Sequence, residues 1–266
     1  MTLIAPDQVK WRKVRYLISS DDGPRSEHTY EYELDLPDFL ASWDVWDYWE
    51  RERVHSMRDH LIDSDVLWDV GAESGWCSLV YAEFVGPNHM VLIEPTPEFW
   101  PNIRATWRRR YQGPPRACYQ GLLSDLDHVP DEIPWPVKVN TVDPNWSQDP
   151  WPQAAYGDLI DRIAYRYIHE HSDSTAQLTA DTLAGFVGPP SALTMDVEGA
   201  ELVVLRGARH ILSVLRPKVW VSIHPDLALR DYGTTTEDLM EFMAGFGYEA
   251  EHLATDHEEH WYFARR

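Results

Sequence analysis

Near the N-terminus, polar and apolar side chains alternate in two stretches. Residues 9–18 and 28–36 both have this period of two, and a turn-forming cluster, Ser19-Ser-Asp-Asp-Gly-Pro24, separates them. Alternation on both sides of such a turn predicts a β-hairpin. Residues 43–62 instead carry aromatic and apolar side chains at helical spacing, which predicts a helix. We expect residues 1–62 to form a cap of hairpin and helix.

From residue 63 onward, predicted strands and helices alternate. Apolar stretches predict strands at 65–70, 89–94, 116–123, 192–196 and 218–224, with a last strand near 261–264. Periodic segments between them predict helices at 76–85, 97–111, 200–215 and 236–246. Alternation of this kind with apolar strands predicts the α/β class, a parallel sheet with helices on both faces. Residues 63–266 are therefore predicted to form the main domain.

An insertion at about residues 127–175 interrupts this alternation. Its first part, from Val129 to Trp151, is rich in proline and contains Trp135, Trp146 and Trp151. A helical segment follows at about 156–170. Long irregular loops in compact domains are usually functional or disordered, and disordered segments are poor in aromatic residues. The insertion is thus predicted to be an ordered lid.

A glycine-containing loop, Asp69-Val-Gly-Ala-Glu-Ser-Gly75, follows the first strand of the main domain. Gly71 permits a tight turn, and Gly75 lets the next helix pack close to a ligand. The middle glycine of the NAD fingerprint is absent, and an acidic Glu73 is unfavourable beside a pyrophosphate. A cationic sulfonium cofactor with an amino-acid tail suits the loop better. An NAD(P)-dependent oxidoreductase and a non-catalytic binding module remain alternatives.

Carboxylates mark the ends of two further predicted strands. Glu94 ends the second strand, where an acid can accept hydrogen bonds from a ribose diol. Asp196, Glu198 and Glu201 crowd around the end of the fourth strand and the start of a helix. Helix capping explains one acid at such a position, whereas three indicate a catalytic or metal-binding role.

These motifs together resemble the FkbM-type S-adenosylmethionine-dependent methyltransferases. The resemblance rests on the loop Asp69–Gly75, the segment Glu94-Pro-Thr-Pro-Glu-Phe99 and the box Asp196-Val-Glu-Gly-Ala-Glu201, and it covers about residues 60–265. It implies a class I methyltransferase fold with a Rossmann-like sheet. It also implies O-methylation of a sugar or another hydroxyl group, with a small molecule or glycan as the acceptor.

The resemblance also implies which residues bind the cofactor. Asp69, Gly71 and Gly75 would line its methionine end, and Glu94 would hold the ribose. The full predicted set is Asp69, Gly71, Ala72, Glu73, Ser74, Gly75, Glu94, Pro95, Leu123, Ser124, Asp125 and Asp196, of which Leu123, Ser124 and Asp125 would flank the adenine. The chain departs from the family pattern at Glu73, where asparagine is common, and at Ser222, where an acid is common.

Catalysis is predicted at His224, Asp196 and Glu198. His224 ends the fifth strand, across the crevice from Asp196, and a histidine there suits removal of a hydroxyl proton near neutral pH. A structural role for His224 at the strand end is the other interpretation. Asp196, Asp226 and Glu198 are alternatively suited to a divalent cation. Trp135, Trp146 and Trp151 are the predicted substrate contacts, because tryptophan faces stack on sugar rings.

Charge and composition narrow the partners. The formal net charge is -21, opposite to the basic field that nucleic-acid binders use, so we expect no nucleic-acid partner. No apolar run suits a membrane span, and no secretion signal is evident at the start. Two cysteines, Cys77 and Cys118, exclude a disulfide framework. We therefore expect a cytoplasmic protein without membrane partners.

Overall fold

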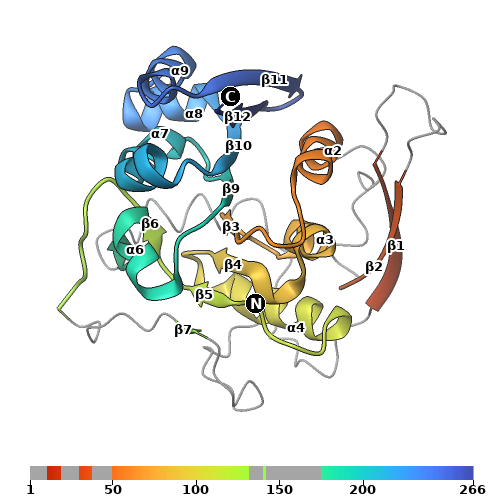
Figure 1. The fold of residues 1–266 in the computed structure, drawn as a ribbon. Coiled ribbons are helices and arrows are strands. Elements are labelled where there is room, and N and C mark those ends of the chain that lie inside the picture. Colours follow the sequence, from red (N-terminus) through yellow and green to blue (C-terminus); the bar gives the residue numbers. More distant parts are fainter. Residues whose placement is uncertain (1–10, 19–29, 38–49, 132–139, 142–174, 266) are drawn as a thin grey trace.

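The central element of the computed structural model is an eight-stranded sheet whose five middle strands are parallel (Figure 1). The structure describes residues 11–18, 30–37, 50–131, 140–141 and 175–265. In sheet order the strands are β11 (Glu249–Thr255), β12 (Glu259–Ala264), β10 (Lys218–Ile223), β9 (Ala192–Asp196), β3 (Leu67–Val70), β4 (Met90–Ile93), β5 (Ala117–Tyr119) and β7 (Asn140–Thr141). The five neighbouring strands β10, β9, β3, β4 and β5 are parallel to one another. β12 pairs antiparallel with β10, β11 antiparallel with β12, and β7 antiparallel with β5. The predicted α/β class is confirmed.

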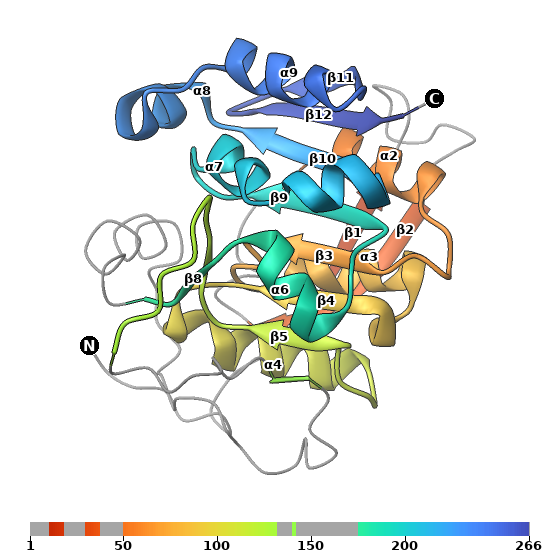
Figure 2. The ribbon, with the colours of Figure 1, turned by 60° about the vertical axis from the view of Figure 1, so that its left-hand side comes forward.

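Helices cover both faces of this sheet (Figure 2). Successive side chains of a strand point to opposite faces, so Leu92 packs in one hydrophobic core and Val91 in the other. The core containing Leu92 also holds residues of α2 (Arg51–His60), α3 (Trp76–Val85) and α4 (Trp100–Arg110). The opposite core holds residues of α6 (Ala180–Val187), α7 (Glu201–Arg206) and α9 (Thr236–Gly245).

Short helical turns complete the described chain. They are the 3₁₀ turns Pro87–His89 and Pro97–Phe99, the π-helical turns Ile211–Leu215 and Ala228–Tyr232, and α8 (Pro225–Leu227). In the described part of the chain, no helix has both the length and the apolar character needed to cross a membrane.

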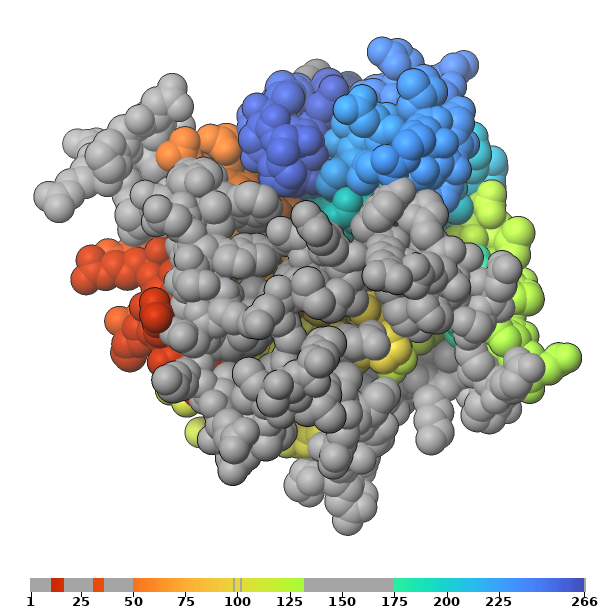
Figure 3. All heavy atoms as spheres, turned by 180° about the vertical axis from the view of Figure 1, so that it is seen from behind, coloured from red at the N-terminus to blue at the C-terminus, as the bar shows by residue number. Residues whose placement is uncertain are grey.

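The predicted N-terminal hairpin is confirmed as β1 (Trp11–Ile18) paired antiparallel with β2 (Tyr30–Pro37). Tyr16 of β1 is fully buried, and its ring lies 5.4 Å from that of Trp76 in α3. The hairpin and α2 therefore share a core with the sheet. Seen from behind, the hairpin lies in red at one edge of the molecule and the C-terminal elements in blue at the top (Figure 3).

Two predicted elements are interrupted, in both cases at a glycine. The strand expected at 116–123 ends at Tyr119, whose side chain lies so close to Gly121 that an added Cβ would be 2.4 Å from it. β6 (Leu122–Leu123) then pairs with β8 (Gln177–Leu178) in a separate sheet. The helix expected at 200–215 is broken after Arg206, because Gly207 packs against the Ser124 carbonyl, 2.0 Å from an added Cβ.

The chain order of the parallel strands creates a switch point between β3 and β9. From β3 the chain adds β4 and β5 on one side, and β9 and β10 later extend the other side. Ligands of open α/β sheets bind at the carboxyl ends of the strands where the order reverses. The glycine loop after β3 and the acids after β9 thus lie at the expected edge.

Part of the predicted insertion, with Trp135, Trp146, Trp151 and the helical segment at about 156–170, lies outside the described residues. The same holds for the first part of the helix expected at 43–62, of which the structure describes α2 from Arg51 onward.

Trp220 of β10 connects the N-terminal helix α2 to the sheet, so replacing it measures how much this packing contributes to the free energy of unfolding. Its indole N–H donates to Ser56 of α2 at 3.0 Å, and its ring stacks on Tyr262 with centroids 4.7 Å apart. Trp220→Ala should lower the free energy of unfolding by about 3–5 kcal/mol, because it leaves a cavity in a packed core. Val214→Ala, at an exposed position, should change it by less than about 0.5 kcal/mol. Chemical denaturation of both variants checks this, and equal losses would contradict it.

Candidate active site

The glycine loop is packed directly against the end of β9. Gly71 has a φ of +85°, and an added Cβ there would lie 1.9 Å from the carbonyl oxygen of Asp196. The N–H groups of Gly71 and Ala72 donate to the Ile93 carbonyl at 2.9 and 3.0 Å. Only glycine meets both requirements, the left-handed conformation and the close approach. The structure therefore holds the loop, β4 and β9 together.

Glu94 is buried at the end of β4 and faces the glycine loop. Its carboxylate accepts hydrogen bonds from the backbone N–H of Glu73 at 2.9 Å and of Thr96 at 2.8 Å. Burial raises the pKa of Glu94 to about 7. Each carboxylate oxygen has two acceptor sites, so capacity remains for the two hydroxyls of a ribose.

Other polar groups of the loop fit a polar ligand. The Asp69 carboxylate is buried, accepts a hydrogen bond from Ser78, and has its pKa raised by burial to about 6. The hydroxyl oxygen of Ser74 is buried and has no hydrogen-bond partner, whereas the Thr96 hydroxyl lies against the Glu94 carboxylate. Buried polar atoms of this kind are uncommon in proteins.

The segment predicted to flank the adenine is fixed by other contacts. The Ser124 N–H donates to the Leu178 carbonyl at 3.0 Å, and Gly207 packs on the Ser124 carbonyl. Leu123 and Ser124 are buried, whereas Asp125 is exposed. Pro95 is buried next to Glu94. Binding of adenine at Leu123, Ser124 and Asp125 stays a prediction.

His224 lies among four carboxylates. The sequence placed Asp196, Glu198 and Glu201 at this end of the sheet but did not indicate Glu258. Its Nε2 atom is 3.7 Å from Asp196, 3.8 Å from Glu198 and 3.0 Å from Glu258, and its Nδ1 atom is 3.2 Å from Glu201. These five residues are called the His224 cluster below. The structure thus brings together all three predicted catalytic residues, at the ends of β9 and β10.

Glu201 orients the histidine. It is almost fully buried at the start of α7, and its Oε1 accepts the Gly199 N–H at 3.0 Å while lying against His224 Nδ1. Nδ1 can donate to this oxygen, which directs Nε2 toward the other three carboxylates.

The carboxylates around His224 determine its pKa. Burial alone would lower its pKa, but the hydrogen bond to Glu201 and the charges of Glu258 and Asp196 raise it to about 12. Burial, together with the neighbouring Asp196, raises the pKa of Glu198 to about 7. In the absence of a ligand, the cluster therefore holds one positive charge among its carboxylates.

Sequence reasoning missed two acids of this region. Glu258 comes from the turn between β11 and β12, and Glu50 precedes α2 and pairs with Arg53. Oxygens of Glu50, Asp196 and Glu258 all lie within 4.8 Å of one another. The run Asp256-His-Glu-Glu-His260 was a signal available in the sequence. Asp226, expected as a metal ligand, is instead exposed on α8 and belongs to none of these groupings.

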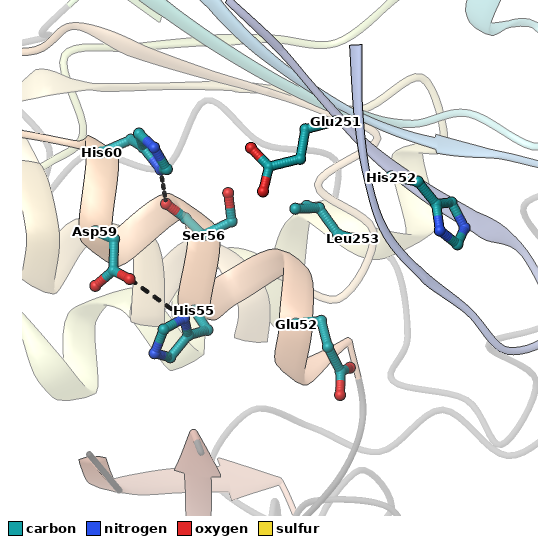
Figure 4. A pocket seen from close by; sticks show the side chains of 8 residues that line it. All are labelled: Glu52, His55, Ser56, Asp59, His60, Glu251, His252 and Leu253. Atoms are coloured by element: carbon teal, nitrogen blue, oxygen red, sulfur yellow. Dashed lines mark hydrogen bonds and ion pairs between the residues drawn. The ribbon is translucent and has the colours of Figure 1, made fainter. Parts of the chain in front are cut away.

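A separate cavity of about 230 Å³ lies between α2 and β11 (Figure 4). Its lining is polar, with His55 paired to Asp59 at 3.4 Å and His60 bonded to the Ser56 carbonyl at 2.8 Å. No member of the His224 cluster lines it. The cavity is thus distinct from the candidate active site.

Residues 69–250 match the family described as "Methyltransferase FkbM domain". The match spans more than half of the chain and includes the glycine loop, Glu94 and the box Asp196–Glu201. The chain belongs to this family. The description of this family as a methyltransferase argues against the NAD(P)-dependent alternative. Glu50 and Glu258 lie outside the matched residues.

Three solved structures are similar to this FkbM chain. An FkbM methyltransferase from Methylobacillus flagellatus is 18% identical with a TM-score of 0.45, and the alignment covers 77% of this chain and 44% of that one. Precorrin-6y C5,15-methyltransferase from Geobacter metallireducens is 12% identical with a TM-score of 0.44, with 81% of this chain and 88% of that one covered. Aeropyrum pernix fibrillarin with natively bound S-adenosyl-L-methionine is 12% identical with a TM-score of 0.42, with 95% of this chain and 99% of that one covered. The chain spans less than half of the first protein's length. No curated protein matches the sequence.

Glu94 provides a test of the cofactor site. Glu94→Ala should weaken S-adenosylmethionine binding by about 1–3 kcal/mol, the cost of losing charge-assisted hydrogen bonds. Calorimetric titration measures this, with Glu241→Ala on the exposed face of α9 as a control that removes the same charge. Unchanged affinity in the Glu94 variant would remove this residue from the site.

Proposed function

We propose that this chain is an S-adenosylmethionine-dependent O-methyltransferase acting on a hydroxyl group of a sugar, glycan or other small molecule. The observation that supports this most directly is the His224 cluster beside the glycine loop. Transfer of a methyl group to a hydroxyl oxygen requires that its proton be removed, and positioned carboxylates and histidines do this in enzymes. The cluster supplies such groups next to the loop that is predicted to contact the cofactor.

Each part of the site has a role in this proposal. The cofactor supplies an electrophilic methyl group, and the glycine loop and Glu94 hold it at the carboxyl edge of β3 and β4. Asp196, whose backbone packs on Gly71, receives the hydroxyl proton of the acceptor, and the protonated His224 beside it positions that carboxylate and balances part of its charge. Glu198 is the most exposed acid of the cluster, at 39% of its side chain, and so faces an incoming acceptor.

The charge of the site restricts the acceptor. Four carboxylates surround one histidine, and Glu50 adds a fifth acid nearby. An anionic group placed beside them would be repelled and desolvated. The acceptor is therefore a neutral or cationic hydroxyl compound, such as an unmodified sugar or an amino sugar, rather than a phosphorylated one.

A screen of acceptors tests the proposed reaction. Neutral sugars, amino sugars and other hydroxyl compounds are incubated with the full chain and S-adenosylmethionine labelled in its methyl group. The proposal predicts labelled methyl ethers, located by mass spectrometry. Transfer only to nitrogen or sulfur would contradict O-methylation, and tight cofactor binding without any transfer would favour the non-catalytic binding module.

Replacing the histidine tests the catalytic assignment. His224→Ala should reduce turnover by about 10²–10⁴-fold, because the charged imidazole that positions the proton-accepting carboxylates at the reacting hydroxyl is lost. Cofactor affinity should stay nearly unchanged, since Glu94 and the glycine loop are intact. Steady-state kinetics and calorimetry separate the two effects. Wild-type turnover in the variant would contradict a catalytic role for His224.

The insertion generates a further prediction about acceptor binding. At least one of Trp135, Trp146 and Trp151 should contact the acceptor, because broad apolar ring faces stack on sugar C–H surfaces. Each tryptophan is replaced by alanine, and the acceptor KM is measured separately from the cofactor Kd. An increase in KM with unchanged Kd is expected for at least one variant. Unchanged acceptor kinetics in all three would show that the lid interpretation is wrong.

A further inference from the structure

We infer that Arg53 is a positioning residue of the cofactor site, where its buried positive charge keeps the Asp69 carboxylate ready for the ammonium group of the cofactor. This inference rests on the proposed function, because Asp69 is predicted to line the methionine end of S-adenosylmethionine. Arg53 lies on α2, which precedes the residues 69–250 that match the family. The N-terminal cap therefore contributes a charged group to this site.

Arg53 and Asp69 are bonded to the same face of α3. The guanidinium group of Arg53 donates a hydrogen bond to the Tyr81 hydroxyl at 3.0 Å, and the Ser78 hydroxyl donates to the Asp69 carboxylate. Residues three apart are neighbours on the surface of a helix, and both Ser78 and Tyr81 are buried. The helix that follows the glycine loop thus holds the guanidinium group and the carboxylate at adjacent positions.

Glu50 is the ion-pair partner of Arg53, but it does not use the whole guanidinium group. The pair is buried, with 3% of Arg53 and 4% of Glu50 exposed. Nη2 of Arg53 donates to both Glu50 and Tyr81, whereas the buried Nε has no hydrogen-bond partner. Buried ion pairs often add little to stability, because both charges lose their hydration. The pair is better explained by the charged groups around it than by the stability of the fold.

Arg53 opposes the effect of burial on Asp69. Burial alone would lower the pKa of Arg53, but its neighbours, chiefly Glu50, raise it above its ordinary value, so the guanidinium group stays charged. Burial raises the pKa of Asp69 to about 6, and the Ser78 hydrogen bond and the Arg53 charge limit this rise. Without Arg53, the carboxylate would take up a proton near neutral pH and would no longer attract an ammonium group.

Glu50 acts on Asp69 in the opposite direction. Its negative charge raises the pKa of Asp69, which the positive charge of Arg53 lowers. Burial brings the pKa of Glu94 to about 7, so Glu94 titrates in a similar range. The other polar and titratable groups that face Asp69, including Glu94, come from α3 and the ends of β4 and β9, and they are Cys77, Ser78, Tyr81, Glu94 and Asp196.

A comparison of two nucleosides isolates the effect at Asp69 from that at Glu94. S-adenosylhomocysteine has the amino-acid end of the cofactor and methylthioadenosine lacks it, whereas both have the ribose. Their affinities for the full chain are measured by calorimetry between about pH 5 and pH 7.5, where an α-amino group is largely protonated. We expect the ratio of the two affinities to favour S-adenosylhomocysteine, and to fall as the pH decreases through about 6, where Asp69 takes up a proton.

Two substitutions should shift this pH dependence in opposite directions. In Arg53→Met the midpoint should rise, and S-adenosylhomocysteine should bind about tenfold more weakly at neutral pH, since each unit of pKa changes the protonation equilibrium about tenfold. Its affinity for methylthioadenosine should not change. Glu50→Gln should lower the midpoint. Arg53→Lys keeps the charge and should stay near the wild-type midpoint, as should Arg206→Met, which removes a positive charge from the exposed side of α7.

The outcomes distinguish this inference from the proposed function. A wild-type chain that binds neither nucleoside would contradict the proposed function. If the wild-type chain binds S-adenosylhomocysteine, the inference is overturned by a midpoint that stays in place in Arg53→Met or Glu50→Gln, or by equal losses of affinity for the two nucleosides. Thermal unfolding shows whether each variant is folded; if Arg53→Met is not, the shift in Glu50→Gln decides.

Discussion

The close approach of Gly71 to the Asp196 carbonyl is the contact on which the site depends. It joins the loop after β3 to the end of β9, the two strands between which the sheet order reverses. An added Cβ would lie 1.9 Å from that oxygen, so any other residue would move the loop away from β9. Because the same loop reaches Glu94 through the Glu73 N–H, this single contact sets the distance between the predicted cofactor residues and the His224 cluster.

Excess negative charge is the second feature of this site. The described residues place Asp196, Glu198, Glu201 and Glu258 around one imidazole, with Glu50 nearby. Gathering like charges in a partly buried position costs free energy, so the arrangement is better explained by what it binds than by stability. A cationic cofactor and a neutral or cationic acceptor are both consistent with this charge.

The sequence predicted those parts of the fold that are determined locally. β3, β4, β9 and β10 are apolar on both faces, and the helix at 76–85 has the bounds expected for it, ending at Gly86. The breaks at Gly121 and Gly207 were missed because their causes, the Tyr119 side chain and the Ser124 carbonyl, act only in the folded chain. β11 was missed because it is mostly exposed and forms by pairing with β12. Asp196 and Glu94 were identified because each lies in a motif that is contiguous in the sequence. Glu258 and Glu50 were missed because they reach the site from distant segments of the chain.

The most direct test of this site is a crystal structure of the chain with S-adenosylhomocysteine bound. We expect the ribose hydroxyls to bind Glu94, the amino-acid end to lie along Asp69–Gly75, and the sulfur to face Asp196 and His224. Binding of the nucleoside elsewhere, for example in the cavity between α2 and β11, with Glu94 free of ligand contacts, would contradict the assignment of the active site to the switch point of the sheet.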